Sequence, residues 1–389
     1  MAKFDLAILG GGPGGYVAAI RSAQLGLKTC IIDKDKLGGI CLNWGCIPTK
    51  ALLKNAEVYH TIKHAYTYGI KVENVSVDFK KNIQRSRDIS NRLSKGIEFL
   101  MKKNKITHIT GIGKLTSKTS LEVKNKQKTD TIEADKIILA TGARPRSFPG
   151  MEFDGNRVIS FKEAMILDSP PKKMIIIGSG AIGSEFAYYY NEFGTEVHMI
   201  EMLDRILPIE DADVSKEVEK SFKNSSIKIS TGTKVSKIES LKTKVKVHTE
   251  RNGKEEILEG DLALLAVGVT GNIEYLGLEE LGIETNGGNI TINEFNQTNI
   301  PNIFAIGDVS GPPWLAHVAS AQGHVAADYI GGHSPKPVDY SNIPSCTYCQ
   351  PQVGSLGMTE AQAKEAGYDV RVGKFLFQAS GKAMAVGDT

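Results

Sequence analysis

The 389-residue sequence predicts an α/β protein built from two doubly wound parallel sheets, the second inserted in the first, followed by a smaller third domain. The length supports this, since one domain takes roughly 150 residues. An internal repeat of strand, glycine-rich turn, helix and strand supports it further. The composition, with 23% charged residues and a net charge of +3, is that of a globular protein and gives no electrostatic case for nucleic acid or anionic membranes.

The repeat recurs at a constant offset of 168 residues. In each copy an apolar run leads into a Gly-x-Gly-x-x-Gly turn and a helix-like stretch. The first glycine allows a tight bend, the second lets backbone approach a pyrophosphate, and the third lets the helix pack on the strand. The free N–H groups at the helix start then face the anion. The glycines concerned are Gly10, Gly12, Gly14 and Gly15 in the first copy and Gly178, Gly180 and Gly183 in the second.

Each copy ends in an acidic residue 18 positions after its third glycine, Asp33 in the first and Glu201 in the second. A carboxylate at this position accepts hydrogen bonds from the two hydroxyls of a ribose. The sequence therefore predicts two Rossmann-like dinucleotide-binding domains. Glu201 also repels a 2′-phosphate, so the second site is expected to prefer NAD over its phosphorylated form.

The domain order follows from where buried-strand patterns and linkers fall. Strand-like runs end at Gly142, Gly268 and Asp308, and the alternating segment 235–258 carries a hairpin signal. From Ile343 onward the pattern predicts β structure as far as Thr389. The expected boundaries are 1–148 and 272–340 for the first domain, 149–271 for the second and 341–389 for the third.

Two cysteines, Cys41 and Cys46, follow the first acidic residue closely. Five residues of regular helix give roughly 7.5 Å of rise and about 140° of rotation, which is too wide for a disulfide. A disulfide therefore needs a distorted first turn, which Asn43 and Gly45 allow. From Cys46 the pattern is helical, and Lys50 lies one turn on, so the helix start and the lysine both favour a thiolate at Cys46. Unpaired core thiols are the alternative interpretation.

The other cysteines leave several interpretations open. Cys346 and Cys349 could complete a four-cysteine zinc site with Cys41 and Cys46, although a zinc ion would consume the first pair. They could also form a second disulfide, or remain two reduced strand cysteines. Cys30 lies inside a buried strand and is expected to be a small core residue.

The segment Gly-Gly-Ile-Cys41-Leu-Asn-Trp-Gly-Cys46-Ile-Pro-Thr-Lys50 lies between the two glycine motifs. In this context it resembles the flavoprotein disulfide reductases, and within them the members that act on lipoamide. The resemblance covers essentially the whole chain. It implies that FAD occupies the first nucleotide site and NAD the second. It also implies that Cys41 exchanges with a substrate dithiol, while Cys46 faces the flavin as a thiolate.

The same resemblance assigns further residues. Lys50 is expected near the flavin, paired with Glu185, and Asp33 at the FAD ribose. His317 is expected beside the flavin or in a structural role, rather than as a base. No metal is implied. The remaining expected cofactor-binding residues are Thr141, Gly142, Gly268, Asp308 and Ala316.

The implied reaction is oxidation of dihydrolipoamide, carried on a lipoyl domain, to lipoamide with NAD⁺. This is the flavoprotein step of 2-oxo acid dehydrogenase complexes, which are assembled on an E2 core. A homodimer is expected at full length, without nucleic acid or membrane. No leader pattern precedes Phe4, so a cytoplasmic protein or a mature organelle-matrix form is expected. The alternatives are a glutathione- or mercuric-reductase-like enzyme of the same superfamily, and a non-catalytic FAD-binding fragment.

One departure from the family concerns the third domain. The family's interface domain carries a His-x-His-Pro segment and a following glutamate, which together act as the general base on the partner subunit's disulfide. The 389 residues contain no His-Pro pair. A protein ending at Thr389 is therefore expected to hold an incomplete α+β interface domain and to lack this base.

Overall fold

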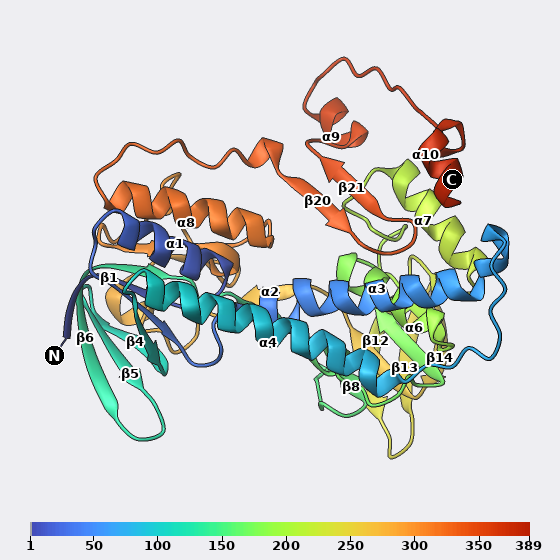
Figure 1. Cartoon of the computed structure of the whole chain (residues 1–389), viewed down its shortest axis with the longest axis horizontal. Coiled ribbons are helices and arrows are strands. Elements are labelled where there is room, and N and C mark those ends of the chain that lie inside the picture. The colour runs from blue at the N-terminus through green and yellow to red at the C-terminus, as the bar shows by residue number, and fades with distance from the viewer. Residues whose placement is uncertain (1) are drawn as a thin grey trace.

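The computed structural model describes residues 2–389 and consists of two sheet-based halves joined by long helices (Figure 1). The sheet of the first half has the order β3-β2-β1-β6-β5-β4. Its strands β1, β2, β3 and β6 run parallel, and β19 adds to the C-terminal part of β6. Their bounds are β1 (Ala2–Leu9), β2 (Thr29–Asp33), β3 (Thr107–Thr110), β4 (Ile112–Ser117), β5 (Ser120–Lys124), β6 (Thr129–Leu139) and β19 (Ile303–Ala305).

Two helices from opposite ends of the chain lie side by side on this sheet, α1 (Pro13–Gln24) and α8 (Ala316–Ile330) (Figure 1). Glycines make their close approach feasible. A Cβ on Gly14 would lie 3.0 Å from the carbonyl oxygen of Ala319, and one on Gly323 would lie 2.7 Å from that of Gly14. The two backbones therefore pack against each other directly, which fixes α8 beside the helix that follows the first glycine turn.

The second half holds a parallel sheet of order β11-β10-β9-β15-β8, with a three-stranded antiparallel sheet β12-β13-β14 against it. The expected hairpin is present, since β13 and β14 join at Asn252 and Gly253. Their bounds are β8 (Val158–Ile159), β9 (Lys173–Ile177), β10 (Glu196–Ile200), β11 (Lys228–Ser230), β12 (Lys234–Ser240), β13 (Val245–Arg251), β14 (Lys254–Gly260) and β15 (Leu262–Leu265).

The chain leaves the first half and returns to it at neighbouring points. Strand β7 (Ala143–Pro145) pairs antiparallel with β16 (Val269–Gly271). Beside this pair, Thr141 Oγ1 donates to the carbonyl of Asn272 at 2.9 Å, and Asn272 Nδ2 donates to the carbonyl of Thr141 at 2.8 Å. The second sheet is thus inserted between two segments, β7 and β16, that pair with each other where the chain leaves and re-enters the first half. The predicted fold class is confirmed.

Two long helices, α3 (Cys46–Lys63) and α4 (Phe79–Lys103), bridge the two halves. The short α2 (Gly39–Trp44) precedes α3, and α6 (Ala181–Glu192) belongs to the second half. Helix α3 packs along α4 and against α6 of the second half (Figure 1). Helix α4 begins where Asp78 accepts a hydrogen bond from the N–H of Lys81 at 3.0 Å, an ordinary N-cap. None of the helices in residues 2–389 is long and apolar enough to cross a membrane.

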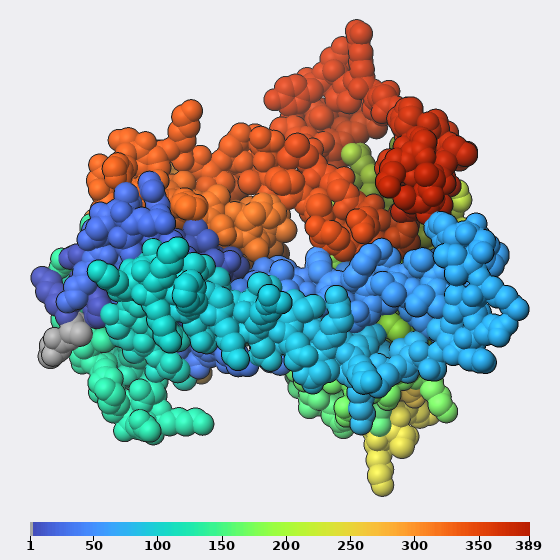
Figure 2. All heavy atoms as spheres, viewed as in Figure 1, coloured from blue at the N-terminus to red at the C-terminus, as the bar shows by residue number. Residues whose placement is uncertain are grey.

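The C-terminal segment starts with the antiparallel pair β20 (Pro344–Thr347) and β21 (Val353–Leu356). The prediction of β structure as far as Thr389 is wrong beyond Leu356, where α9 (Glu360–Glu365) and α10 (Gly381–Val386) follow. Thr359 and Gln362 form a capping box that starts α9, and Ser380 caps α10. Figure 2 shows the dark-red end of this segment beside the light-blue stretch that follows α3, where the hydroxyl of Tyr68 donates to the carbonyl of Val386 at 2.9 Å.

The remaining elements are short connections and one longer helix. They are α5 (Phe161–Ala164), α7 (Ala212–Asn224), β17 (Thr285–Asn286), β18 (Asn289–Ile290), and the 3₁₀ turns η1 (Ala65–Tyr68), η2 (Glu279–Leu281), η3 (Gly307–Ser310), η4 (Tyr340–Asn342) and η5 (Phe377–Ala379).

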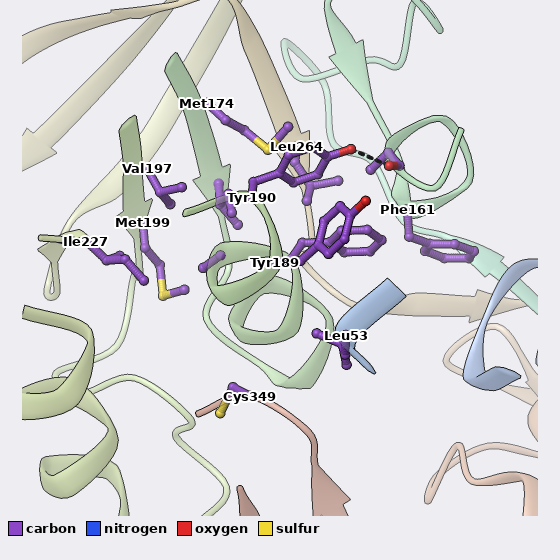
Figure 3. Close-up of a cluster of buried hydrophobic side chains, with 14 of the residues drawn as sticks. Leu53, Phe161, Met174, Tyr189, Tyr190, Val197, Met199, Ile227, Leu264 and Cys349 are labelled. Atoms are coloured by element: carbon purple, nitrogen blue, oxygen red, sulfur yellow. Dashed lines mark hydrogen bonds between the residues drawn. The ribbon is translucent and has the colours of Figure 1, made fainter. Parts of the chain in front are cut away.

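Adjacent tyrosines of α6 lie in the largest buried cluster, which joins the second sheet to α3 (Figure 3). Tyr189 and Tyr190 are both almost fully buried. The hydroxyl of Tyr190 donates to the carbonyl of Ala164. The hydroxyl of Tyr189 is also buried but has no partner within residues 2–389. Because a buried polar group is costly unless it is hydrogen-bonded, the two hydroxyls should have opposite energetic effects.

We therefore expect Tyr190→Phe to lower the free energy of unfolding by about 1–3 kcal/mol, because the Ala164 carbonyl loses its donor inside the core. Tyr189→Phe should be neutral or slightly stabilising, because it removes an unpaired hydroxyl. Urea unfolding of the two variants measures both effects. Equal losses in the two variants would contradict the assignment.

Candidate active site

The two cysteines face each other across a break between two helices. Helix α2 ends at Trp44, Gly45 has φ −149° and ψ −113°, and α3 starts at Cys46. A Cβ on Gly45 would lie 3.1 Å from Ile40 Cγ2, so this glycine also permits tight packing. The distortion that a Cys41–Cys46 disulfide would require is present, and the two cysteine side chains are in contact. All five cysteines are free thiols.

The contact makes the two thiols chemically unequal. The hydrogen bond from Cys41 lowers the pKa of Cys46, as do the nearby Lys50 ammonium and the N–H at the start of α3, against the opposing effects of burial and Asp308. The same hydrogen bond raises the pKa of Cys41, and burial adds to it. Both shifts favour the thiolate at Cys46, the residue at the helix N-terminus, and the proton at Cys41.

The last turn of α2 is held in place by two side chains. Asn43 Nδ2 donates to the carbonyls of Gly39 at 3.0 Å and Leu37 at 3.2 Å. Arg87 of α4 donates from Nη1 to the carbonyl of Asn43 at 2.7 Å, and its guanidinium lies 4.9 Å from the centre of the Trp44 ring. Sequence reasoning missed Arg87, because it is one of several basic residues in a charged helix and nothing local marks it.

An ion pair connects the cysteine helix to the second half of the molecule. Lys50 Nζ lies 2.9 Å from Glu185 Oε1 and 3.1 Å from Oε2, and Glu185 is buried in α6. The pairing expected from the resemblance is therefore present. Sequence reasoning missed Tyr348, whose backbone N–H donates to Glu185 Oε1 at 2.9 Å. Tyr348 lies between Cys346 and Cys349, and only these two cysteines suggested a function from the sequence of this segment.

The two glycine turns adopt the same backbone conformation. Gly10 has φ +115°, and a Cβ there would lie 2.0 Å from the carbonyl oxygen of Ala140. Gly178 has φ +97°, and a Cβ there would lie 2.4 Å from that of Ala266. Each turn ends at a glycine that caps the following helix without a side-chain hydrogen bond, Gly12 for α1 and Gly180 for α6. The first N–H groups of both helices therefore remain free of side-chain caps, as a pyrophosphate site requires.

The acidic residue at the end of each second strand braces its own glycine turn. Asp33 accepts from the N–H of Gly11 at 2.6 Å and from that of Asp35 at 2.9 Å. Burial raises the pKa of Asp33, and these two N–H groups oppose the rise. Glu201 accepts from the N–H groups of Ser179 and Leu203, each at 2.9 Å. The donors are equivalent in the repeat, so the repeat extends to individual hydrogen bonds.

The other expected cofactor residues fall on the same side as the turns. Gly142 and Gly268 have φ values of +70° and +98°, and a Cβ at either position would meet no atom within 4 Å, so their backbone is open to a ligand. Burial raises the pKa of Asp308, a carboxyl that a hydroxylated ligand chain could satisfy. Together with the uncapped helices, Asp33 and Glu201, these residues are compatible with two dinucleotides. Ala316 opens α8, and His317 Nε2 lies 3.0 Å from the carbonyl of Pro344.

The two cysteines of the second pair differ in their exposure to solvent. Cys346 is exposed, whereas Cys349 is buried and donates to the carbonyl of Pro351 at 3.2 Å. Within residues 2–389 no group of three or more His, Cys, Asp or Glu side chains is placed to hold a metal ion. Cys30 is fully buried in β2, where burial raises its pKa to about 12.

Comparison with known proteins agrees with this geometry. A family model of the pyridine nucleotide-disulphide oxidoreductases matches residues 4–323, and a model of their dimerisation domain matches residues 343–389. The chain therefore belongs to this family, and it is an oxidoreductase. It is 46% identical over 404 residues to a dihydrolipoyl dehydrogenase of Rhizobium etli, covering 99% of this chain and 84% of the relative. The dihydrolipoyl dehydrogenase of Bacillus subtilis is 43% identical over 398 residues, covering 100% and 84%.

Solved structures show the same likeness. LpdA of Mycobacterium tuberculosis superposes with a TM-score of 0.91 at 26% identity, covering 100% of this chain and 85% of that one. The HOCl-induced flavoprotein disulfide reductase RclA of Escherichia coli superposes with a TM-score of 0.89 at 27% identity, with the same coverage. The resemblance inferred from the cysteine motif is confirmed.

The unequal thiols give a direct prediction. Cys41→Ala removes the hydrogen bond that most lowers the pKa of Cys46, so this pKa should rise by about one unit or more. Cys41→Ser keeps a donor and should stay near the parent value. The pH dependence of the alkylation rate at Cys46, resolved by peptide mass spectrometry on reduced protein, measures this pKa. An equal rise in both variants would show that the hydrogen bond is not the cause.

Proposed function

We propose that the chain oxidises dihydrolipoamide to lipoamide with NAD⁺, FAD and the Cys41–Cys46 pair carrying the electrons. The net reaction is dihydrolipoamide + NAD⁺ → lipoamide + NADH + H⁺. The observation that carries the proposal is the pair of touching, unequal thiols at the helix break, one turn from the Lys50–Glu185 ion pair. The similarity to dihydrolipoyl dehydrogenases over nearly the whole chain supports the choice of substrate.

The thiol chemistry follows from this inequality. In the oxidised enzyme a substrate thiolate attacks Cys41 Sγ, the Cys41–Cys46 bond breaks, and Cys46 leaves as a thiolate. Cys46 is the better leaving group because its pKa is the lowered one. The second substrate thiol then displaces Cys41, which takes the proton. The substrate leaves as a disulfide, and the enzyme holds one thiol and one thiolate.

The chain's other residues keep that thiolate in place. Lys50 supplies a positive charge to Cys46, and Glu185 fixes the ammonium from a buried position. Asp308, Gly142 and Thr141 are proposed to hold FAD with the first glycine turn and Asp33, and Ala316 and His317 to border it. FAD, when bound there, accepts the electron pair and passes it on to the pyridine nucleotide.

For the second nucleotide site we propose NAD, held by the second glycine turn, Gly268 and Glu201. Glu201 is buried, and its carboxylate is already oriented by three donors, the N–H and hydroxyl of Ser179 and the N–H of Leu203. A fixed carboxylate accepts from ribose hydroxyls and repels a phosphate.

A homodimer is supported by the match to a dimerisation domain. The substrate dithiol is proposed to arrive on a lipoyl domain of a 2-oxo acid dehydrogenase complex, in the cytoplasm. The domain bounds we propose remain 1–148 with 272–340, 149–271 and 341–389, which place the crossing pair β7–β16 near the two junctions.

The redox assignment predicts a split between the two cysteines. In FAD-loaded protein, Cys46→Ser should abolish lipoamide turnover and also the absorbance beyond the flavin's own bands that a neighbouring thiolate produces. Cys41→Ser should abolish turnover but keep that absorbance, and NADH oxidation with a dye should persist in both. Cys346→Ser, at an exposed cysteine, is the control and should change nothing. Survival of the absorbance in Cys46→Ser would refute the assignment.

The nucleotide assignment predicts a preference for NADH over NADPH. Replacing Glu201 by Gln keeps the shape but removes the charge, which should narrow the ratio of the two kcat/KM values by roughly 10- to 100-fold, or about 1–3 kcal/mol. The exposed Asp204→Asn should leave the ratio unchanged. Equal kcat/KM values for the two nucleotides in the parent protein would argue against an NAD site.

A further inference from the structure

The Lys50 ammonium touches a residue outside both nucleotide-binding halves. Its Nζ lies 4.6 Å from the centre of the Tyr348 ring, at the end of β20. Tyr348 also donates its backbone N–H to Glu185 Oε1 at 2.9 Å. One residue of the C-terminal segment therefore contacts both members of the ion pair, the cation through its ring and the carboxylate through its backbone.

These contacts restrict the position of the Lys50 ammonium. The Lys50 side chain is 37% exposed, so water can reach the ammonium and the chain can swing outward. An aromatic face attracts a cation and covers it at the same time. With Glu185 on one side and the ring on another, the ammonium is held in the partly desolvated position from which it acts on Cys46.

We propose that Tyr348 is a positioning residue for the proposed reaction, and that the face of its ring holds the Lys50 ammonium beside Cys46. The inference rests on the proposed redox role of Cys46. It implies that the placement of the segment matched as a dimerisation domain influences the ionisation of the thiol pair. The ring, rather than the hydroxyl, carries the effect, since Tyr348 contacts the ion pair through its ring and its backbone N–H.

Several other titratable groups surround Lys50 and Cys46. None of them is replaced in the variants compared below, so their contribution to the pH dependence is the same in each variant. Glu185 comes from α6, and Cys46 from the start of α3. The others are Cys41 of α2, Asp308 of η3, Tyr16 of α1 and Cys349 after β20.

The test measures the pH at which reduced, FAD-loaded enzyme loses half of its long-wavelength thiolate absorbance. Tyr348→Phe keeps the ring and should match the parent. Tyr348→Leu keeps the backbone donor but loses the ring, so its midpoint should rise by about 0.3 to 1 pH unit. Tyr275→Leu, at a tyrosine that is 92% exposed, is the matched control and should not shift.

A second series of variants changes the electrostatics of the ring without changing its shape, so misfolding cannot explain the result. Phenylalanine carrying one, two or three fluorine atoms, inserted at position 348, keeps the shape of the ring while weakening its attraction for a cation. The midpoint should rise with each fluorine. A midpoint that ignores fluorination, or an equal shift in Tyr348→Phe and Tyr348→Leu, overturns the role of the ring. Absence of the absorbance in the parent protein would instead overturn the proposed function itself.

Discussion

The ion pair between Lys50 and Glu185 is the interaction on which the site depends. Glu185 is buried in α6, and a buried carboxylate is costly unless a cation and further donors satisfy it. Lys50 of α3 supplies the cation, and the backbone of Tyr348 supplies a donor. Three segments from distant parts of the chain are thus brought to one point, one helical turn from Cys46. The pair therefore ties the cysteine helix to the second sheet at the position where the thiols need a fixed positive charge.

The backbone does the remaining work of alignment. At both nucleotide turns a glycine with positive φ lets a neighbouring carbonyl come closer than any side chain would permit. The acidic residue at the end of each second strand then hydrogen-bonds the turn, in the same pattern at Asp33 and Glu201. Both carboxylates therefore have a structural role within the turn itself. In the proposed nucleotide sites this fixed orientation would reduce the cost of ordering the carboxylates on binding.

Local pattern made much of this predictable. The glycine turns, the acidic residue that follows each of them and the cysteine–lysine spacing are each set by a few nearby residues, so the sequence was sufficient to place them. The break at Gly45 was expected once the resemblance paired Cys41 with Cys46, because no regular helix brings these two residues together. Arg87 and Tyr348 were missed because their roles depend on contacts with residues 44 and 163 positions away. The helices after Leu356 were not predicted because α9 and α10 span only six residues each, which is too short for a clear helical period.

The five cysteines show why burial alone does not decide reactivity. Burial raises the pKa of Cys30 and of Cys349 to about 12, so both remain protonated and inert. Cys46 is also largely removed from water, yet its pKa is lowered. The difference lies in its neighbours, because a donor thiol, an ammonium and a helix start face Cys46, whereas Cys349 faces the carboxylate of Glu185. The carboxylate that fixes Lys50 for one thiol therefore suppresses ionisation of the other. The Lys50–Glu185 pair thus adds to the larger effects of the Cys41 thiol at Cys46 and of burial at Cys349, and all of them favour the thiolate at Cys46 over Cys349.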